Sequence, residues 1–323
     1  MIMNNKIAVL DLGSQTFRLA IAGVGSKNLE ILHSELANVR LGEGLSGTGM
    51  LSSQGIERGL LALERFGGLI ERYKVERVRV CGTEALRQAK NANIFIDEAY
   101  KAGFSIEILT GEDEAALSAI GVCSTLKDVQ GISLIADVGG GSTELILING
   151  NTILFSRSVK IGAVSLTEDF LNSDPPTSKE FATLERYVKN ILDHIKQGMM
   201  YHPQALIGVG GSATTAGAML LKMTEYDPRR IRGLSMGVKN LGGLLSYIKN
   251  MQRSERSTAT GLAPDRADII PAGLAVFLSV LSVFNLKEMI ITDGGLLIGL
   301  LVNSIQKEFS IDVGRQYNSS LYL

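Results

Sequence analysis

Few side chains in this sequence can support covalent, zinc or disulfide chemistry. There are two cysteines and three histidines among 323 residues. Cys81 and Cys123 lie in apolar contexts without C-x-x-C spacing, so we expect buried free thiols, as in a reducing cytoplasm, and not a disulfide or a zinc site. The histidines have no acid and nucleophile pattern around them, which argues against a Ser-His-Asp hydrolase.

The sequence also lacks an excess of charge and a long hydrophobic run. Its formal net charge is −1, from 32 Lys and Arg against 33 Asp and Glu, so we expect no nucleic-acid partner. The most apolar stretch, residues 269–284, is interrupted by Pro271 and Gly273 and is shorter than the ~20 residues of a membrane span. It predicts a buried helix. With no signal peptide recognised, we expect a cytoplasmic protein without a membrane partner.

Glycine, in contrast, is abundant, with 36 residues, and the most informative cluster lies within residues 134–148. An apolar strand leads into Asp137, turns and leaves as a second apolar strand. The turn contains Gly139, Gly140, Gly141, Ser142 and Thr143. Backbone N–H groups without neighbouring Cβ atoms can approach phosphate oxygens, and the two hydroxyls can add donors. Asp137 would repel phosphate unless a hard cation lay between them, which indicates magnesium. An ordinary glycine-rich β-turn is the alternative.

The N-terminal hairpin, residues 7–21, repeats this pattern. An apolar strand reaches Asp11 and Gly13, then the small polar residues Ser14, Gln15 and Thr16, and a second apolar strand follows. Two copies of one supersecondary unit indicate a duplicated domain. Two such hairpins that face each other across a cleft would hold a phosphate chain from both sides.

Two further glycine-rich segments call for different interpretations. Residues 42–47 match G-x-G-x-x-G, but no strand leads directly into them and more loop follows, so a dinucleotide-binding fold is disfavoured. Gly210, Gly211 and Ser212 follow a short apolar strand and begin a helix, whose N-terminus can bind an anion.

Two charged side chains are candidates for catalysis, each with a structural alternative. Arg87 follows the end of a strand at Gly82-Thr83, so it is either a phosphate ligand or a solvated helix arginine. Glu114 lies in the first turn of a helix that Thr110 can cap. It either complements the helix dipole or, as a carboxylate kept ionised by that dipole, orients and deprotonates an attacking water.

The order of these motifs resembles that of the actin-like ATPase superfold, and more closely the exopolyphosphatase and guanosine pentaphosphate phosphohydrolase (Ppx/GppA) family. The matching residues are Asp11 to Ser14, Arg40 to Gly42, Gly82-Thr83 with Ala85 to Arg87 and Asn91, Gly111 with Glu114-Ala115, Asp137 to Glu144, Gly210 to Ser212, and Arg266 to Asp268 with Pro271 to Gly273. The resemblance implies an α/β fold with two actin-like (ribonuclease H-like) domains flanking a phosphate-binding cleft. We place the first domain at residues 1–129 plus 302–323 and the second at residues 130–301.

The resemblance also implies roles for individual residues. Glu114 would be the general base, Arg87 a further catalytic phosphate ligand, and Asp137 and Glu144 would lie at the metal and the attacking water. Magnesium would be the cofactor, with Asp11 as an additional ligand. The expected phosphate-binding residues are Ser14, Gln15, Thr16, Gly139, Gly140, Gly141, Ser142, Thr143, Gly210, Gly211 and Ser212.

The implied activity is release of terminal orthophosphate from inorganic polyphosphate or from guanosine pentaphosphate. We expect short polyphosphate chains to be preferred, inorganic polyphosphate or guanosine penta- or tetraphosphate to be the bound partner, and the protein to be a homodimer. A polyphosphate- or alarmone-binding regulatory protein with little turnover is the second hypothesis. It is motivated by Gln15, where the family has Asn, and by Leu297-Ile298, where the family has Arg-Glu. A sugar or acetate kinase on the same superfold is the third, and it is disfavoured because no acceptor site is recognisable.

Overall fold

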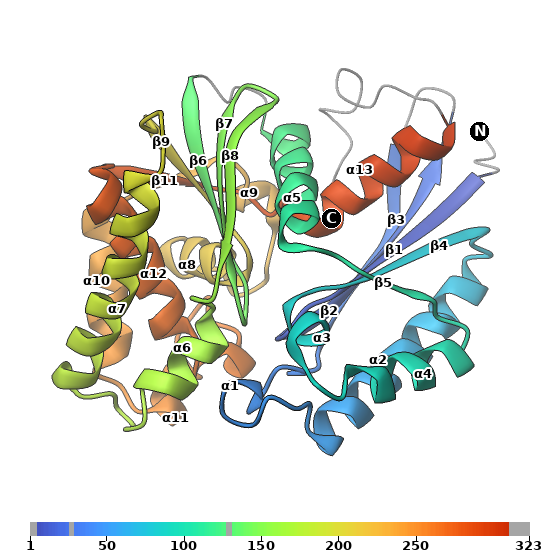
Figure 1. Cartoon of the computed structure of the whole chain (residues 1–323), viewed down its shortest axis with the longest axis horizontal. Coiled ribbons are helices and arrows are strands. Elements are labelled where there is room, and N and C mark those ends of the chain that lie inside the picture. The colour runs from blue at the N-terminus through green and yellow to red at the C-terminus, as the bar shows by residue number, and fades with distance from the viewer. Residues whose placement is uncertain (1–4, 26–28, 127–130, 310–323) are drawn as a thin grey trace. The chain divides into compact units, whose positions relative to one another are not determined.

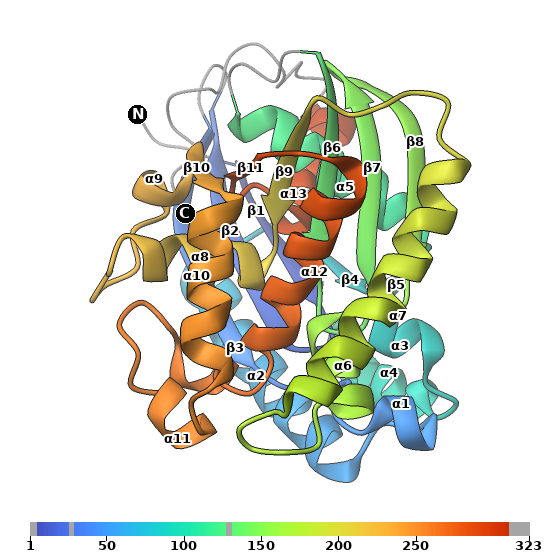
Figure 2. The ribbon, with the colours of Figure 1, turned by 90° about the vertical axis from the view of Figure 1, so that its left-hand side faces the viewer.

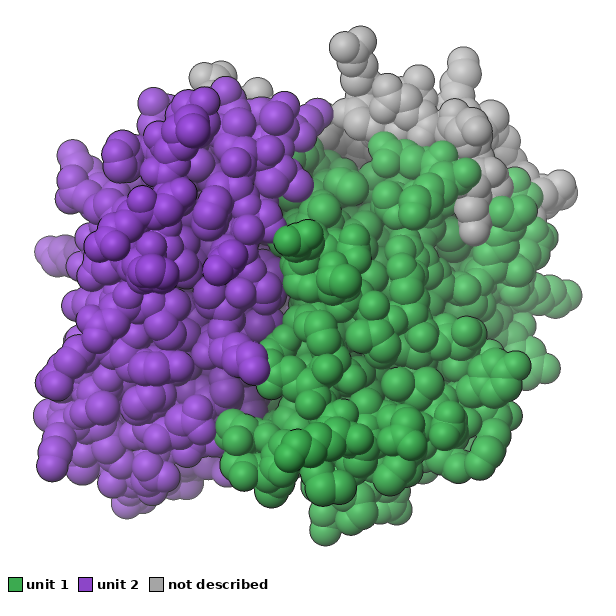
Figure 3. Space-filling view, in the orientation of Figure 1, with its two compact units in different colours: residues 1–127, 294–323 green, residues 128–293 purple. Residues whose placement is uncertain are grey.

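The structure is a computed structural model, and it describes residues 5–25, 29–126 and 131–309. The chain divides into two compact units (Figure 3). Unit 1 comprises residues 1–127 and 294–323, and unit 2 comprises residues 128–293. Each unit contains one mixed sheet.

In unit 1, the sheet has the strand order β3-β2-β1-β4-β5. Its strands are β1 (Asn5–Leu12), β2 (Thr16–Val24), β3 (Leu29–Asn38), β4 (Arg77–Gly82) and β5 (Ile106–Ile108). β2 is antiparallel to β1 and β3, whereas β4 is parallel to β1 and β5. The helices are α1 (Leu45–Thr48), α2 (Ser53–Arg72), α3 (Glu84–Gln88), α4 (Ala92–Lys101), α5 (Gly111–Thr125) and α13 (Leu296–Phe309).

The two faces of this sheet are covered by different helices (Figure 1). Because successive side chains of a strand point to opposite faces, Ala8, Leu10 and Leu12 of β1 join the core beneath α2 and α4. Ile7 and Val9 join the second core, to which α5 and α13 contribute. Asp11, two residues after Val9, therefore belongs to the α5 and α13 face.

α5 and α13 are in backbone contact. A Cβ on Gly121 would lie 2.1 Å from the Gly295 carbonyl oxygen, and one on Gly299 would lie 1.7 Å from that of Leu117. Leu297 and Ile298 of α13, the departure from the family pattern noted in the sequence, are buried in the same core and form apolar packing there. The whole of α13 thus belongs to unit 1, and the chain crosses between units before residue 294, not at the predicted residue 302.

In unit 2, the sheet has the order β10-β11-β9-β6-β7-β8. Its strands are β6 (Ile132–Val138), β7 (Thr143–Asn149), β8 (Thr152–Val159), β9 (Ala205–Val209), β10 (Leu234–Gly237) and β11 (Glu288–Ile291). In the reverse direction this order is β8-β7-β6-β9-β11, and these five strands have the same order and directions as β3-β2-β1-β4-β5 of unit 1. β10 is an added edge strand. This confirms the predicted duplication and the two actin-like (ribonuclease H-like) domains.

The helices of unit 2 are α6 (Ala163–Phe170), α7 (Ser178–Gln197), α8 (Gly211–Leu220), α9 (Pro228–Ile231), α10 (Val238–Lys249), α11 (Arg253–Arg256) and α12 (Ile270–Phe284), with a 3-10 turn at Pro264–Arg266. Figure 2 shows α12 among α6, α7 and α10. α12 is the most apolar stretch of the sequence, and its side chains are largely buried in the core of unit 2, as predicted. No helix in the described part of the chain has the length and apolarity to cross a bilayer.

Both cysteines are free, as predicted. Cys81 is buried in β4, and burial raises the pKa of its thiol to about 12. Cys123 is half-buried, and burial raises its pKa as well. Because the thiolate is the reactive form, neither side chain is suited to act as a nucleophile near neutral pH.

The α5 and α13 crossing leads to a stability prediction. Gly299→Ala places a methyl group against a backbone carbonyl that cannot rotate away, so we expect a loss of about 1–3 kcal/mol in the free energy of unfolding. Gly68→Ala is the matched control, because a Cβ there meets nothing within 4 Å and improves helix propensity by about 0.5–1 kcal/mol. Urea unfolding of both variants measures the difference, and an unchanged or higher stability of Gly299→Ala would contradict the crossing.

Candidate functional site

The turn between β6 and β7 presents backbone N–H groups. Its carbonyls are held by the segment that follows β8: Gly139 O accepts from Ala163 N at 2.9 Å, and Gly140 O accepts from Val164 N at 2.8 Å. Within the described residues, the N–H groups of Gly140 and Gly141 have no hydrogen-bond partner. Adjacent unpaired N–H groups in a tight turn form an anion-binding concavity.

The hydroxyls of this turn are used inside the protein. Ser142 Oγ donates to Glu144 Oε1 at 2.9 Å, and Thr143 Oγ1 donates to the Ile161 carbonyl at 2.8 Å. Gly162 follows Ile161, and a Cβ on it would lie 2.2 Å from Gly140 O. Glycine at this position therefore allows the loop after β8 to support the turn, and the donors that the turn presents are its amides.

Two carboxylates lie opposite each other next to the turn of this hairpin. Asp137 and Glu144 are register partners across β6 and β7, so both side chains lie on the same face of the sheet. Glu144 is only 2% exposed. Its Oε1 accepts from Ser142 Oγ and, at 2.7 Å, from Ser158 Oγ of β8.

Ser158 was not recognised in the sequence. It is the register partner of Glu144 across β7 and β8, and this register shifts between Leu147 and Ile148. The alternation of β8 indicates which of its side chains share a face, but the bulge determines which of them lies opposite Glu144.

The hairpin of unit 1 has the same backbone arrangement. Gly13 N donates to Thr16 O at 3.0 Å, as Gly139 N does to Ser142 O at 2.9 Å. Ser14 O accepts from Gly42 N, and Gln15 O accepts from Arg40 N, each at 2.9 Å. The segment Arg40 to Gly42 therefore supports this turn as residues 162–164 support the other.

Gln15 is the exceptional side chain of this turn. It is 5% exposed, and its Nε2 is buried without a hydrogen-bond partner in the described part of the chain. A buried donor without a partner costs free energy, so a ligand oxygen at this position would satisfy it. The G-x-G-x-x-G segment that begins at Gly42 forms a turn and α1, which agrees with the sequence argument against a dinucleotide site.

The residue opposite the aspartate differs between the two hairpins. Arg18 is the register partner of Asp11, and its Nε lies 3.4 Å from Asp11 Oδ2. Asp11 thus has a cation where Asp137 has the second carboxylate, Glu144. The acidic pair in unit 2 concentrates negative charge, whereas Arg18 offsets the charge of Asp11 in unit 1.

Glu114 and Arg87 form an ion pair in unit 1. Glu114 is buried in the first turn of α5, which Thr110 caps by accepting from Asp113 N at 3.1 Å. Arg87 Nη1 donates to Glu114 Oε2 at 3.2 Å and to the Leu109 carbonyl at 2.7 Å. Burial acts to lower the pKa of Arg87, but Glu114 and Glu84 raise it above its ordinary value. Arg87 is therefore not a solvated helix arginine.

Glu84 is a further member of this cluster that the sequence analysis missed. Its carboxylate is buried, and it binds Arg87 Nη2 and Gln88 Nε2. The signal was available, since Glu84 and Arg87 have the i, i+3 spacing of helix ion pairs. Together Glu84, Glu114 and the Leu109 carbonyl fix the direction of the guanidinium.

The turn before α8 lies beside Asp137. Gly210 has φ +89°, and a Cβ there would lie 2.6 Å from Val138 O and 3.0 Å from Asp137 Oδ1. Gly211 packs against the Arg266 guanidinium, and Ser212 Oγ packs against Gly273 of α12. The structure thus brings Gly210 to the C-terminal end of β6, beside the carboxylate of Asp137. Close packing explains the small residues at positions 211 and 212.

The donor set fits a hard cation held by few protein ligands. Within the described residues there is no group of three or more His, Cys, Asp and Glu side chains placed to hold a metal. Mg²⁺ is commonly bound by one or two carboxylates together with waters and substrate phosphates. Asp137 and Glu144, beside a turn with unpaired N–H groups, meet that requirement.

Comparisons with known proteins give consistent results. A model of the Ppx/GppA phosphatase family matches residues 20–308. Exopolyphosphatase 2 of Mycobacterium tuberculosis is 33% identical over 282 residues, covering 84% of this chain and 88% of that protein. The guanosine-5'-triphosphate,3'-diphosphate pyrophosphatase of Pseudoalteromonas atlantica is 28% identical over 329 residues, covering 98% of this chain and 62% of that protein. The crystal structure of the Aquifex aeolicus Ppx/GppA family member has a TM-score of 0.80 and 32% identity, covering 94% of this chain and 98% of that one.

The contacts of Glu144 predict how two serines of β8 differ. Ser158→Ala removes a hydrogen bond to a buried carboxylate, so we expect the free energy of unfolding to fall by about 1.5–3 kcal/mol. Ser156→Ala is the matched control, because Ser156 Oγ is buried without a partner among the described residues, and its removal should leave stability unchanged or raise it. Chemical denaturation of both variants tests this, and equal losses would refute the assigned contact.

Proposed function

The chain belongs to the Ppx/GppA phosphatase family, and on this basis we propose that it is a phosphoanhydride hydrolase that releases terminal orthophosphate from inorganic polyphosphate or from a guanosine pentaphosphate-type nucleotide. The names of the relatives from M. tuberculosis and P. atlantica support these two substrate classes. The main structural support is the β6 and β7 hairpin, in which the unpaired amides of Gly140 and Gly141 adjoin the Asp137 and Glu144 carboxylates.

In this proposal the phosphate chain binds through backbone donors. The N–H groups of Gly140 and Gly141 bind phosphate oxygens in unit 2. In unit 1 the buried Nε2 of Gln15 is a further donor, since it has no partner in the described structure. The longer amide at position 15 thus retains the hydrogen-bonding capacity of the Asn that the family has there.

Glu114 is the proposed general base. Its burial and its ion pair with Arg87 favour a carboxylate of fixed orientation, which can align a water and accept its proton. Phosphoryl transfer to water needs little covalent chemistry and depends on positioning and on neutralisation of charge. Arg87 holds Glu114 and contributes positive charge next to it.

Magnesium is the proposed cofactor, with Asp137 and Glu144 as the residues that would hold it. When bound, the ion would offset the negative charge of the phosphate oxygens. Asp11 was expected to be an additional ligand. Because Arg18 already offsets its charge, we assign the ion to the carboxylates of unit 2.

The binding hypothesis differs from the hydrolase in one respect, which is turnover. Leu297 and Ile298 are buried in the core of unit 1, so the charges of the Arg-Glu pair are absent there, as the binding hypothesis noted. We favour hydrolysis because Glu114, Asp137 and Glu144 are all present. The cleft between the domains, the homodimer and the cytoplasmic location stay predictions.

The activity prediction rests on Glu114. Glu114→Gln keeps the size of the side chain but removes the base, so we expect Mg²⁺-dependent orthophosphate release to fall about 10²–10⁴-fold. Release is measured from short and long polyphosphate and from guanosine pentaphosphate, with Mg²⁺ or EDTA. Glu112→Gln is the matched control, since Glu112 is exposed in the same helical turn, and it should keep the full rate.

Three outcomes would change the proposal. A rate retained by Glu114→Gln would overturn the assignment of the base. Binding of the same substrates by both proteins without release would establish the regulatory hypothesis. Release that persists in EDTA would exclude the magnesium requirement.

A further inference from the structure

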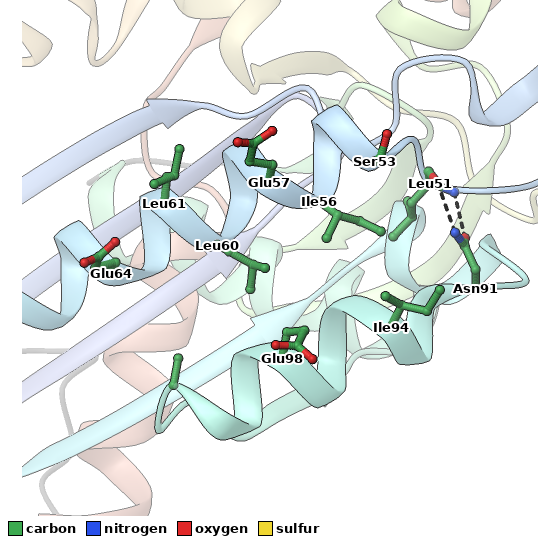
Figure 4. Close-up of a pocket in the computed structure, with 11 residues that line it drawn as sticks. Leu51, Ser53, Ile56, Glu57, Leu60, Leu61, Glu64, Asn91, Ile94 and Glu98 are labelled. Carbon is green, nitrogen blue, oxygen red and sulfur yellow. Dashed lines mark hydrogen bonds between the residues drawn. The ribbon is translucent and has the colours of Figure 1, made fainter.

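A groove of about 870 Å³ lies between α2 and α4 of unit 1 (Figure 4), and none of its lining residues is assigned to phosphate chemistry. The α2–α4 groove is lined by Leu51, Ser53, Ile56, Glu57, Leu60, Leu61, Glu64, Asn91, Ile94, Glu98 and Ala102. The residues of each helix recur at intervals of three or four, so two helix faces form its walls.

The walls of the groove are apolar, and its lower layer is rigid. Ile56 and Leu60 extend toward α4 (Figure 4), and both pack on the core of unit 1. Beneath them, a Cβ on Gly59 would lie 2.7 Å from the Phe95 ring, so the two helices are in close contact. Two large side chains remain exposed to solvent, Leu61 at 59% and Ile94 at 48%.

One end of the groove is closed by a pair of hydrogen bonds. Asn91 Oδ1 accepts from Leu51 N at 2.7 Å, and Asn91 Nδ2 donates to Leu51 O at 3.0 Å. This pair ties the start of α2 to the start of α4 and fixes their separation.

The rim of the groove is acidic. Glu57 and Glu64 have no ion pair or hydrogen bond from their side chains within the described residues. The two arginines next to them along α2 do not offset them, because Arg58 pairs with Glu43 and Arg65 pairs with Glu35. On the α4 side, Glu98 pairs with Lys101 at 2.6 Å.

We propose that the α2–α4 groove is a docking site for an amphipathic helix of a partner protein, whose apolar face is flanked by Lys or Arg. Residues 53–64 of α2 extend over about 17 Å at 1.5 Å per residue, which matches about three turns of a bound helix. Apolar side chains of that helix would cover Leu61 and Ile94, and its cations would meet Glu57 and Glu64. A second copy of this chain is disfavoured, since two acidic rims repel each other.

The probe is a synthetic Leu/Lys peptide of about 14 residues, long enough for the three turns. Its matched control is the same peptide with Glu in place of every Lys. Fluorescence anisotropy with the full chain should show that the Lys peptide binds, more weakly at high salt, and that the Glu peptide does not.

Two variants locate the binding. Leu61→Ser changes an exposed side chain to a neutral polar one, so it leaves both the core and the charge of the rim intact. It should weaken binding of the Lys peptide about tenfold or more, as should Glu57→Lys combined with Glu64→Lys. The matched control is Glu71→Lys with Glu76→Lys, which has the same change of charge at exposed positions outside the groove and should keep the affinity. Circular dichroism and urea unfolding confirm that each variant is folded.

Several outcomes would overturn the proposal. These are no binding of the Lys peptide, equal binding of the two peptides, or equal loss in the control variant. Self-association in sedimentation equilibrium that Leu61→Ser abolishes would instead identify a second copy as the occupant. The proposal does not rest on the hydrolase activity, so failure of one leaves the other standing.

Discussion

The direction of the peptide groups in the two hairpin turns is the constraint on which the proposed chemistry depends. Each turn has its carbonyls held from behind, by Arg40 and Gly42 in unit 1 and by Ala163 and Val164 in unit 2. These contacts fix the carbonyls of unit 2 on the side of the supporting segment, so the amides of Gly140 and Gly141 remain available as donors for an anion. The glycines at 42 and 162 are needed because these supporting segments come within Cβ distance of the turns.

The duplication preserved this backbone while the charges diverged. Apart from the added edge strand β10, the order and directions of β1 to β5 agree with those of β6 to β11, and the two hairpin turns have the same length. Both hairpins have an aspartate at the same position, but its register partner is Arg18 in unit 1 and Glu144 in unit 2. The same hairpin therefore supports an ion pair in one unit and an acidic pair in the other. This difference, more than the glycines, is the reason why we assign the proposed cation to unit 2.

Much of this could be predicted from local sequence. The hairpins, the capped start of α5 and the buried helix α12 each depend on a contiguous pattern, and each was found. The contact of Ser158 with Glu144 depends on a bulge in the pairing of β7 and β8. The contact of Thr143 with Ile161 depends on where the loop after β8 lies. These are set by register and tertiary packing, which period-two alternation does not specify.

The unit boundary and the role of Glu84 also depend on contacts that local sequence does not specify. Residues 294–301 belong to unit 1 because α13 packs backbone to backbone on α5, a contact between segments far apart in the sequence. The i, i+3 spacing of Glu84 and Arg87 indicates a local ion pair, but the contact of Arg87 with Glu114 depends on tertiary packing, and only the two together hold the guanidinium.

The asymmetry between the hairpins is tested most directly by binding of Mn²⁺, as a paramagnetic substitute for Mg²⁺, in the presence of inorganic phosphate. Electron paramagnetic resonance of free Mn²⁺ gives the affinity of Asp137→Asn and of Asp11→Asn, two variants with the same change of charge. We expect Asp137→Asn to lose most of the affinity and Asp11→Asn to retain it. Equal losses, or a larger loss in Asp11→Asn, would contradict the assignment of the cation to the carboxylate pair of unit 2.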